Sequence, residues 1–295
     1  MVAQISDPHL VAPGERKYDL IDPEPYLRLA LERLTRIDPA PQALVFSGDL
    51  ADRGEPAAYA RLRELVEPVA AALGAEVVWV MGNHDERAAF SATLLDHEDE
   101  APQDRVHDVD GLRIVALDTS VPGYHHGDLT DDQLDWLAGV LGDPAPHGTL
   151  LALHHPPVPV PMLRAAELIE LADQHRLAEV VEGTDVRAIL GGHLHFTSWS
   201  TFAGVPVSVT SSTCYTSDPA PDGRFVSGVD GHHAVTVLHL YDDRVVHTVV
   251  PVAEAPEASG FPAEAAALVE ALSPEERREL ISRKDSPFYR GELPV

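Results

Sequence analysis

Short apolar runs alternate with amphipathic stretches over the first two thirds of the chain. The runs are rich in β-branched residues and bounded by turn-forming residues, as buried strands are, and they cover residues 43–46, 77–80, 112–117, 150–153 and 186–190. A further strand is expected over residues 2–6. Between them, apolar residues recur at helical spacing over residues 26–34, 57–73, 131–141 and 163–181. This alternation predicts an α/β fold built in layers, with mostly parallel strand pairing.

The pattern changes after Gly192, where helical spacing gives way to strands joined by tight turns. These expected strands cover residues 197–202, 205–210, 234–241 and 244–250, and residues 219–233 form a loop rich in Asp, Gly and Pro. From Pro251 the composition turns to Ala, Glu and Pro, and Ser273 begins a helix in a capping-box pattern with Glu276. We therefore expect a main domain over residues 1–252 and a C-terminal helical extension with a loose tail over residues 253–295.

The chain carries 48 acidic and 21 basic residues, a formal net charge of -27. Such a surface repels nucleic acid and anionic lipid, so we expect neither nucleic-acid binding nor stable membrane association. The single cysteine, Cys214, excludes an internal disulfide and a cysteine-based zinc site. No apolar run reaches the roughly 18 residues of a membrane helix. Because the first expected strand leaves no room for a signal peptide, we expect a cytoplasmic protein.

Five short motifs each follow a predicted strand: DPH at residues 7–9, GDLADRG at 48–54, GNHD at 82–85, HHP at 154–156 and GHLH at 192–195. Because open α/β sheets place their ligands beyond the carboxyl ends of the strands, these motifs are expected to meet. Together they supply two carboxylates, one amide oxygen and four imidazoles, from Asp7, Asp49, Asn83, His9, His154, His193 and His195.

These seven donors exceed the set that one first-row metal ion accepts, which is about four to six ligands including water. They suit two ions about 3.5–4 Å apart that share a bridging carboxylate. Mixed nitrogen and oxygen donors without thiolate point to Fe, Mn, Zn or Co. In an extended segment, His193 and His195 would point to the same side, and the two preceding glycines would let the backbone pass close to the ions.

The order and spacing of the motifs resemble the calcineurin-like metallophosphoesterase superfamily, whose pattern is D-x-H, G-D-x-x-(x)-x-x-G, G-N-H-[DE], H and G-H-x-H. The chain is similar in particular to the class III cyclic-nucleotide phosphodiesterases of mycobacteria and other actinobacteria. GDLADRGEPAAY, VWVMGNHDERA, LDTSVPGYHHGDL, STCYT and the tail stretch RKDSPF carry this likeness. The resemblance implies a four-layer αββα sandwich of two mixed β-sheets, in which residues 1–252 form the catalytic domain.

The resemblance also implies roles for the donor residues. The two implied ligand sets, with Asp49 as the bridge, are Asp7, His9 and His195 for the first ion and Asn83, His154 and His193 for the second. The family pattern selects His154 rather than the adjacent His155. It implies two divalent or trivalent ions, with Fe and Mn expected first and Zn or Co as alternatives.

Three residues are expected to contact the substrate, and a fourth to orient one of them. His84 would hydrogen-bond a phosphate oxygen or the leaving oxygen and can protonate the leaving group, while Asp52 would orient His84. In the YHHG stretch, His126 would reach the substrate phosphate, which Asn83 would also contact.

The implied activity is hydrolysis of 3′,5′-cAMP, 2′,3′-cyclic nucleotides or both to nucleoside monophosphates, by in-line attack of a hydroxide that bridges the ions. The alternative is a phosphodiesterase of broader specificity, for example on glycerophosphodiesters. The motifs leave this alternative open because they build the metal core and not the pocket for the alcohol group. Members of the family are often dimers, so a homodimer is one assembly to expect.

Overall fold

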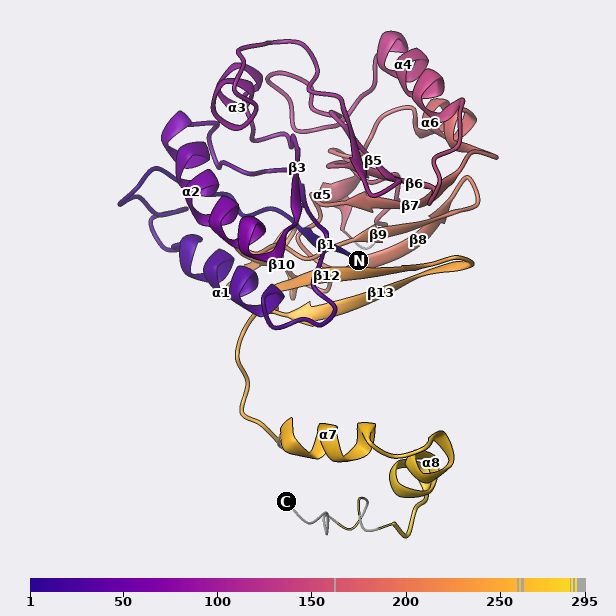
Figure 1. Cartoon of the computed structure of the whole chain (residues 1–295). Coiled ribbons are helices and arrows are strands. Elements are labelled where there is room, and N and C mark those ends of the chain that lie inside the picture. Colours follow the sequence, from indigo (N-terminus) through magenta and orange to yellow (C-terminus); the bar gives the residue numbers. More distant parts are fainter. Residues whose placement is uncertain (162, 259, 261–262, 287, 289, 291–295) are drawn as a thin grey trace. The chain divides into compact units, whose positions relative to one another are not determined.

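The computed structural model describes residues 1–161, 163–258, 260, 263–286, 288 and 290 (Figure 1). Contacts divide the chain into two compact units, Met1–Ala253 and Glu254–Val295. The roles expected for these parts, catalytic domain and C-terminal extension, stay predictions.

Two mixed β-sheets form the centre of the first unit. In the five-stranded sheet, ordered β13-β12-β1-β2-β3, strands β1, β2 and β3 are parallel, and β12 pairs antiparallel with both β1 and β13. The six-stranded sheet is ordered β4-β5-β6-β7-β9-β8, and its four central strands are parallel. The strands are β1 (Val2–Ile5), β2 (Ala43–Ser47), β3 (Glu76–Val80), β4 (Arg105–Val109), β5 (Leu112–Leu117), β6 (Thr149–Leu153), β7 (Val186–Gly191), β8 (Ser198–Phe202), β9 (Val205–Val209), β12 (Ala234–Tyr241) and β13 (Arg244–Pro251).

The two sheets pack face to face, and helices cover their outer faces (Figure 1). Along β2, Leu44 and Phe46 contact the core beneath the helices, whereas Val45 joins the core between the sheets. This alternation explains why every residue of the strand is buried and apolar or small. The covering helices are α1 (Glu24–Leu34), α2 (Pro56–Leu73) and α3 (Arg87–Leu94) on the first sheet, and α4 (Asp131–Leu141) and α6 (Gln174–Val181) on the second. The expected four-layer αββα sandwich is confirmed.

One expected helix, over residues 163–181, is divided in two. The structure has a short α5 (Arg164–Glu167) and then α6, with Asp173 between them in a left-handed conformation at φ 43°. The intervening backbone pairs with the loop at Gly127, which accepts a 2.8 Å hydrogen bond from Ala172 N–H and donates a 3.1 Å bond to Glu170. Tertiary pairing therefore overrides the helical spacing of the sequence.

The expected loop over residues 219–233 is mostly irregular, but its end forms β11 (Gly228–Val229), which pairs with β10 (Thr216–Ser217). In the second unit, the structure contains α7 (Ala263–Glu270) and α8 (Pro274–Ser282). The predicted capping box of α8 is confirmed by reciprocal hydrogen bonds between Ser273 and Glu276. The end of the expected loose tail, residues 291–295, lies outside the described residues. Within the part of the chain that is described, none of the helices has the length and apolar character needed to span a membrane.

Candidate metal centre

The carboxyl ends of the parallel strands bring the predicted donors together. Asp7 follows β1, Asp49 follows β2, Asn83 follows β3, and His154 comes directly after β6. Beyond β7 lie the two remaining histidines of the GHLH motif. The strands end at one edge because β1, β2 and β3 are parallel, as are β5, β6 and β7.

The first donor group consists of Asp7, His9, Asp49 and His195, all buried, with donor atoms within 4.8 Å of one another. His9 Nε2 lies 3.1 Å from His195 Nε2 and 3.4 Å from Asp49 Oδ2. His195 Nε2 lies 3.3 Å from Asp7 Oδ1. The group therefore points two ring nitrogens and two carboxylates at one place.

The opposite nitrogen of each ring has a hydrogen-bond acceptor. His9 Nδ1 lies 3.2 Å from the Asp52 carboxylate, and His195 Nδ1 donates to the Tyr215 carbonyl at 2.8 Å. These bonds assign the proton to Nδ1 and leave the Nε2 lone pairs facing each other. Because two facing lone pairs repel unless a cation lies between them, this donor set fits a metal ion.

The second donor group is built around His154. Its Nδ1 donates to the Ser47 carbonyl at 2.8 Å, while its Nε2 lies 3.2 Å from Asn83 Oδ1 and 3.4 Å from Asp49 Oδ1. His193 Nε2 donates to the Ile169 carbonyl at 2.9 Å, which leaves His193 Nδ1 as its free nitrogen. Asp49 thus offers one carboxylate oxygen to each donor group.

Hydrogen bonds distinguish His154, which the family pattern selects, from its neighbour His155, a choice that strand geometry alone does not make. Both nitrogens of the His155 ring have protein partners, the Thr119 hydroxyl at 2.8 Å and the His125 carbonyl at 3.2 Å. Although His155 lies close enough to His154 and His193 to form a donor cluster, its ring is already satisfied. Burial also holds the pKa of His155 well below its usual range, so the ring is neutral.

The charges of the buried groups favour a cation. Burial lowers the pKa of His9 and of His193 to about 3, so both rings are neutral and can donate a lone pair. Burial alone would raise the pKa of Asp7, but the adjacent His195 outweighs it and lowers the value to about 2. For His154, burial opposes the charged ring, yet Asp49 dominates and raises its pKa to about 9.

The backbone is strained at five of the seven predicted ligands. Their φ angles are positive: Asp7 at 51°, His9 at 42°, Asp49 at 52°, His193 at 69° and His195 at 59°. Such a conformation costs roughly 1–3 kcal/mol at a non-glycine residue, and it concentrates at functional sites. It also corrects our expectation of an extended GHLH segment, because β7 ends at Gly191 and both histidines lie in a left-handed turn.

Two glycines are required for close packing around the donors. A Cβ atom on Gly192 would lie 2.1 Å from Ser6 Oγ and 2.8 Å from Asp7 Oδ2. A Cβ atom on Gly82 would lie 2.2 Å from both the main-chain nitrogen and the Oδ1 atom of Asp49. Gly192 therefore packs against Ser6 and the Asp7 carboxylate, which accepts a hydrogen bond from the His193 main-chain N–H, and the expected approach of this backbone to the ions stays a prediction.

The Asp52 carboxylate orients His9, whereas we expected it to orient His84. His84 Nδ1 donates instead to the Asp52 main-chain carbonyl at 2.8 Å, and the nearer carboxylate oxygen is 3.7 Å away. The carboxylate forms an ion pair with the buried ammonium group of Lys17. Burial would raise the pKa of Asp52, but the bonds to His9 and Lys17 hold it below its usual range. The burial of Lys17 could not be predicted from the sequence, because Lys17 lies in a loop without hydrophobic periodicity.

Replacement of Lys17 by methionine is expected to lower the free energy of unfolding by about 3 kcal/mol, because the change leaves the Asp52 carboxylate buried without its cation. The methionine keeps most of the side-chain volume. Urea denaturation at one fixed Mn²⁺ concentration measures the effect.

The matched control is Arg36→Met. Arg36 and its partner Glu32 are both more than half exposed, so this change should cost no more than about 1 kcal/mol. An equal loss in the two variants would contradict a structural role for the Lys17–Asp52 pair.

His125 is the histidine of the YHHG stretch that contacts the site, whereas we expected His126. Its Nδ1 lies 2.8 Å from Asn83 Nδ2, and its ring lies 5.3 Å from that of His84. The ring of His126 instead lies against Tyr124. Adjacent histidines in a loop have no fixed period, so sequence could not choose between them.

Asp85, the last residue of the GNHD motif, anchors the loops that carry the donors. Its carboxylate accepts main-chain hydrogen bonds of 2.9–3.1 Å from Gly82, Leu50 and Ala51 and a 2.9 Å bond from the Tyr59 hydroxyl. Burial, with the nearby Asp49 charge, raises the pKa of Asp85 to about 6. Asp85 therefore joins the loop after β2 to the loop after β3.

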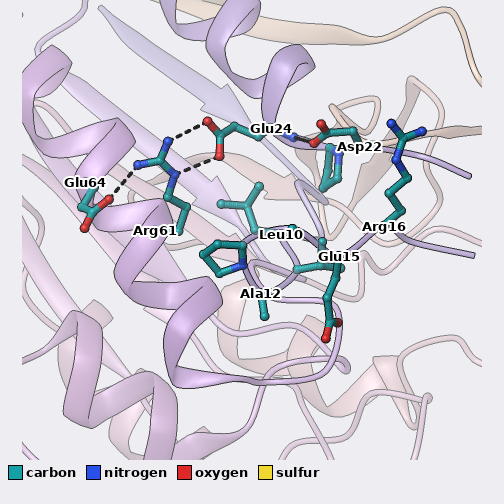
Figure 2. A pocket seen from close by; sticks show the side chains of 12 residues that line it. Leu10, Ala12, Glu15, Arg16, Asp22, Glu24, Arg61 and Glu64 are labelled. Atoms are coloured by element: carbon teal, nitrogen blue, oxygen red, sulfur yellow. Dashed lines mark hydrogen bonds and ion pairs between the residues drawn. The ribbon is translucent and has the colours of Figure 1, made fainter. Parts of the chain in front are cut away.

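A separate hollow of about 490 Å³ is lined by residues 10–16, by residues 22–24 and by two side chains of α2 (Figure 2). Arg61 in this hollow bonds to Glu24 through Nε at 2.8 Å and Nη2 at 2.7 Å, and to Glu64 at 2.7 Å. Four carboxylates and two guanidinium groups line the hollow, so its net charge disfavours an anionic substrate. The metal centre is the better candidate for phosphoryl chemistry.

Comparison with known proteins identifies the family of this chain. Residues 1–196 match the model of the calcineurin-like phosphoesterase family. The chain belongs to this family. Its resemblance to the phosphoesterases, stated above from the five motifs, is thereby confirmed.

This calcineurin-like phosphoesterase is also similar in sequence to two curated phosphodiesterases. It is 54% identical over 252 residues to a cAMP/cGMP dual specificity phosphodiesterase of Mycobacterium tuberculosis, covering 85% of this chain and 79% of the relative. It is 52% identical over 251 residues to a probable cyclic nucleotide phosphodiesterase of Rhodococcus erythropolis, covering 85% and 83%. Among solved structures, a dimetal phosphatase from Danio rerio has the same fold, with a TM-score of 0.61, 18% identity and coverage of 86% and 96%.

Proposed function

We propose that this chain is a metal-dependent phosphodiesterase that hydrolyses 3′,5′-cAMP, 2′,3′-cyclic nucleotides or both to nucleoside monophosphates. The observation that carries the proposal is the Asp49 carboxylate, which offers Oδ2 to His9 and Oδ1 to His154, each at 3.4 Å. One carboxylate facing two donor groups suits a pair of adjacent cations. The names of the mycobacterial and rhodococcal relatives support cyclic nucleotides as the substrate class.

We assign the two ions to the two donor groups. The assigned ligands, with Asp49 shared, are Asp7, His9 and His195 for one ion and Asn83, His154 and His193 for the other. Nitrogen and oxygen donors of this kind suit Fe, Mn, Zn or Co, and the family likeness puts Fe and Mn first with Zn or Co as alternatives. When bound, such ions supply positive charge that activates water and offsets charge on phosphoryl oxygens. A phosphodiester carries one negative charge, so local cations can bind it despite the acidic surface.

We assign His84 to the substrate because its ring is held in place but is not needed as a ligand. Its Nδ1 is bonded to the Asp52 carbonyl, and its main-chain N–H donates to Asp49 Oδ1 at 2.8 Å. Among the described residues the Nε2 atom has no hydrogen-bond partner, and the side chain is 29% exposed. In its protonated form the ring donates from Nε2 to a phosphate oxygen or to the leaving oxygen, and that proton can pass to the departing alkoxide.

We assign the second substrate contact to His125. Its ring contacts both Asn83 and His84, so it lies at the edge of the place where the phosphate would bind. The side chain is exposed in this structure, which leaves its outer nitrogen accessible to a ligand.

A rate panel on the Mn²⁺-loaded protein tests the proposal. It compares 3′,5′-cAMP, 2′,3′-cAMP, glycerophosphoethanolamine and 4-nitrophenyl phosphate at equal metal concentration. We expect kcat/KM for at least one cyclic nucleotide to exceed that of the other two substrates by about tenfold or more, a difference of about 1.4 kcal/mol in transition-state binding.

The other outcomes separate the alternatives. Similar rates for cyclic nucleotides and the glycerophosphodiester would favour a phosphodiesterase of broader specificity. Turnover of the nitrophenyl monoester alone would overturn the proposal.

Two finer proposals rest on family likeness and charge. We propose a cytoplasmic enzyme without nucleic-acid partners, which the net charge of -27 supports. A homodimer is the assembly we propose from the family likeness, and light scattering after size exclusion would measure it.

A further inference from the structure

An exposed tyrosine stands beside the first donor group in a strained turn. Tyr18 is 66% exposed, and its φ of 54° places it in the left-handed region. The turn is closed by two main-chain hydrogen bonds between Lys17 and Ile21, both 2.9 Å long. A bulky side chain adopts this conformation only where its surroundings impose it, and such strain often marks a ligand contact.

Tyr18 is connected to the donor group through Tyr215. Their hydroxyls lie 3.3 Å apart, and their rings meet edge to face with centroids 5.8 Å apart. The Tyr215 ring packs against His195, with centroids 4.3 Å apart. Lys17 Nζ lies 4.8 Å from the centroid of Tyr18 and 5.4 Å from that of Tyr215. An aromatic surface therefore leads from a predicted metal ligand to the exposed ring of Tyr18.

We propose that Tyr18 stacks on the base of the nucleotide whose phosphate lies at the metal centre, an inference that rests on the proposed function. The aromatic surface runs from the donor group outward to solvent. A nucleotide whose phosphate lies at the donor group would extend its base in this direction, onto the exposed ring of Tyr18. Aromatic stacking of a base strengthens binding by roughly 5- to 150-fold. Because every base has a π-face, Tyr18 would accept adenine and guanine alike.

On the Asn83 side of the metal centre, the exposed ring of Tyr124 packs against His126 and not against a predicted ligand. A hollow of about 230 Å³ next to Asn83 has no aromatic side chain among its described lining residues. Its cation, Arg87, is occupied by the Asp118 carboxylate at 3.0 Å and the Ser120 carbonyl at 2.9 Å. We therefore place the base on the Tyr18 side.

Calorimetric titration of the Mn²⁺-loaded protein with AMP and with ribose 5-phosphate tests the inference, because these ligands differ only in the base. We expect Tyr18→Ala to weaken AMP binding by about tenfold and to leave ribose 5-phosphate unchanged. Tyr18→Phe keeps the aromatic face, so AMP should bind to it within about twofold of wild type. GMP should respond to the three proteins as AMP does.

Tyr241→Ala is the matched control. Tyr241 is 55% exposed and ends β12, which runs antiparallel to β1 and so places this residue at the opposite edge of the sheet. Its replacement should change neither affinity. Equal losses for both ligands in Tyr18→Ala, or no loss for AMP, would overturn the inference. Cyclic-AMP hydrolysis by the wild type tests the proposed function separately, since the titration needs no turnover.

Discussion

Replacement of Asp49 by asparagine is expected to lower kcat/KM on the best cyclic nucleotide by more than about 100-fold, with loss of bound metal. Changes to residues that only orient ligands typically cost about 10–100-fold in metal affinity or activity, so loss of a shared donor should exceed this range. The substitution removes the charge that faces both His9 and His154. Asparagine keeps the side-chain shape, tolerates the φ of 52°, and retains an oxygen for the His84 N–H.

Activity and metal content, by plasma mass spectrometry after gel filtration, should be measured on the same samples. Asp110→Asn is a suitable control, because Asp110 is exposed and has nearly the same backbone, with a φ of 51°. It should retain wild-type activity and metal. If Asp49→Asn remained close to wild type in excess Mn²⁺, the assignment of a shared carboxylate would be wrong.

The second large effect is expected for His84→Ala, which should lower kcat without releasing metal. General acid catalysis contributes about 10²–10⁴-fold, so we expect kcat to fall within this range. Metal content should stay at the wild-type level, because the His84 ring bonds to a main-chain carbonyl and contributes only its main-chain N–H to Asp49. Turnover at saturating cyclic nucleotide and metal content together measure the two parts of this prediction.

The control for this variant is His175→Ala. His175 is exposed on α6 and has no place in the proposed chemistry, so its loss should leave both quantities unchanged. Release of metal from the His84→Ala protein would show that His84 serves the ions and would remove its proposed role in protonation.

The convergence of the donor motifs could be predicted from sequence because regular strands have a readable pattern. Residues 43–46 are a continuous apolar run and residues 2–6 read VAQIS, and the polar motifs that follow them lie at the carboxyl ends of parallel strands. Parallel pairing then places Asp7 beside the residues of the GDLADRG motif, as the 3.1 Å bond from Asp7 N–H to the Gly48 carbonyl shows.

Contacts made by irregular loops could not be predicted in this way. His125 and His126 are equivalent in sequence, and only the course of the loop brings His125 to Asn83. The helical spacing of residues 163–181 hid a break caused by pairing with Gly127, which is distant along the chain. For Lys17, nothing local distinguishes a buried ammonium group from a solvated one, because its partner Asp52 lies on another loop.

The left-handed backbone at five donor positions affects how a saturation-mutagenesis map of this protein should be interpreted. At His9 and His195, substitution by valine would remove the imidazole and would also place a β-branched residue in a left-handed backbone conformation that such residues avoid. At Asn83 and His154, whose φ angles are not positive, only the side-chain chemistry is lost. Intolerance scores for the two classes are therefore comparable only for glycine, a substitution that accepts both backbones.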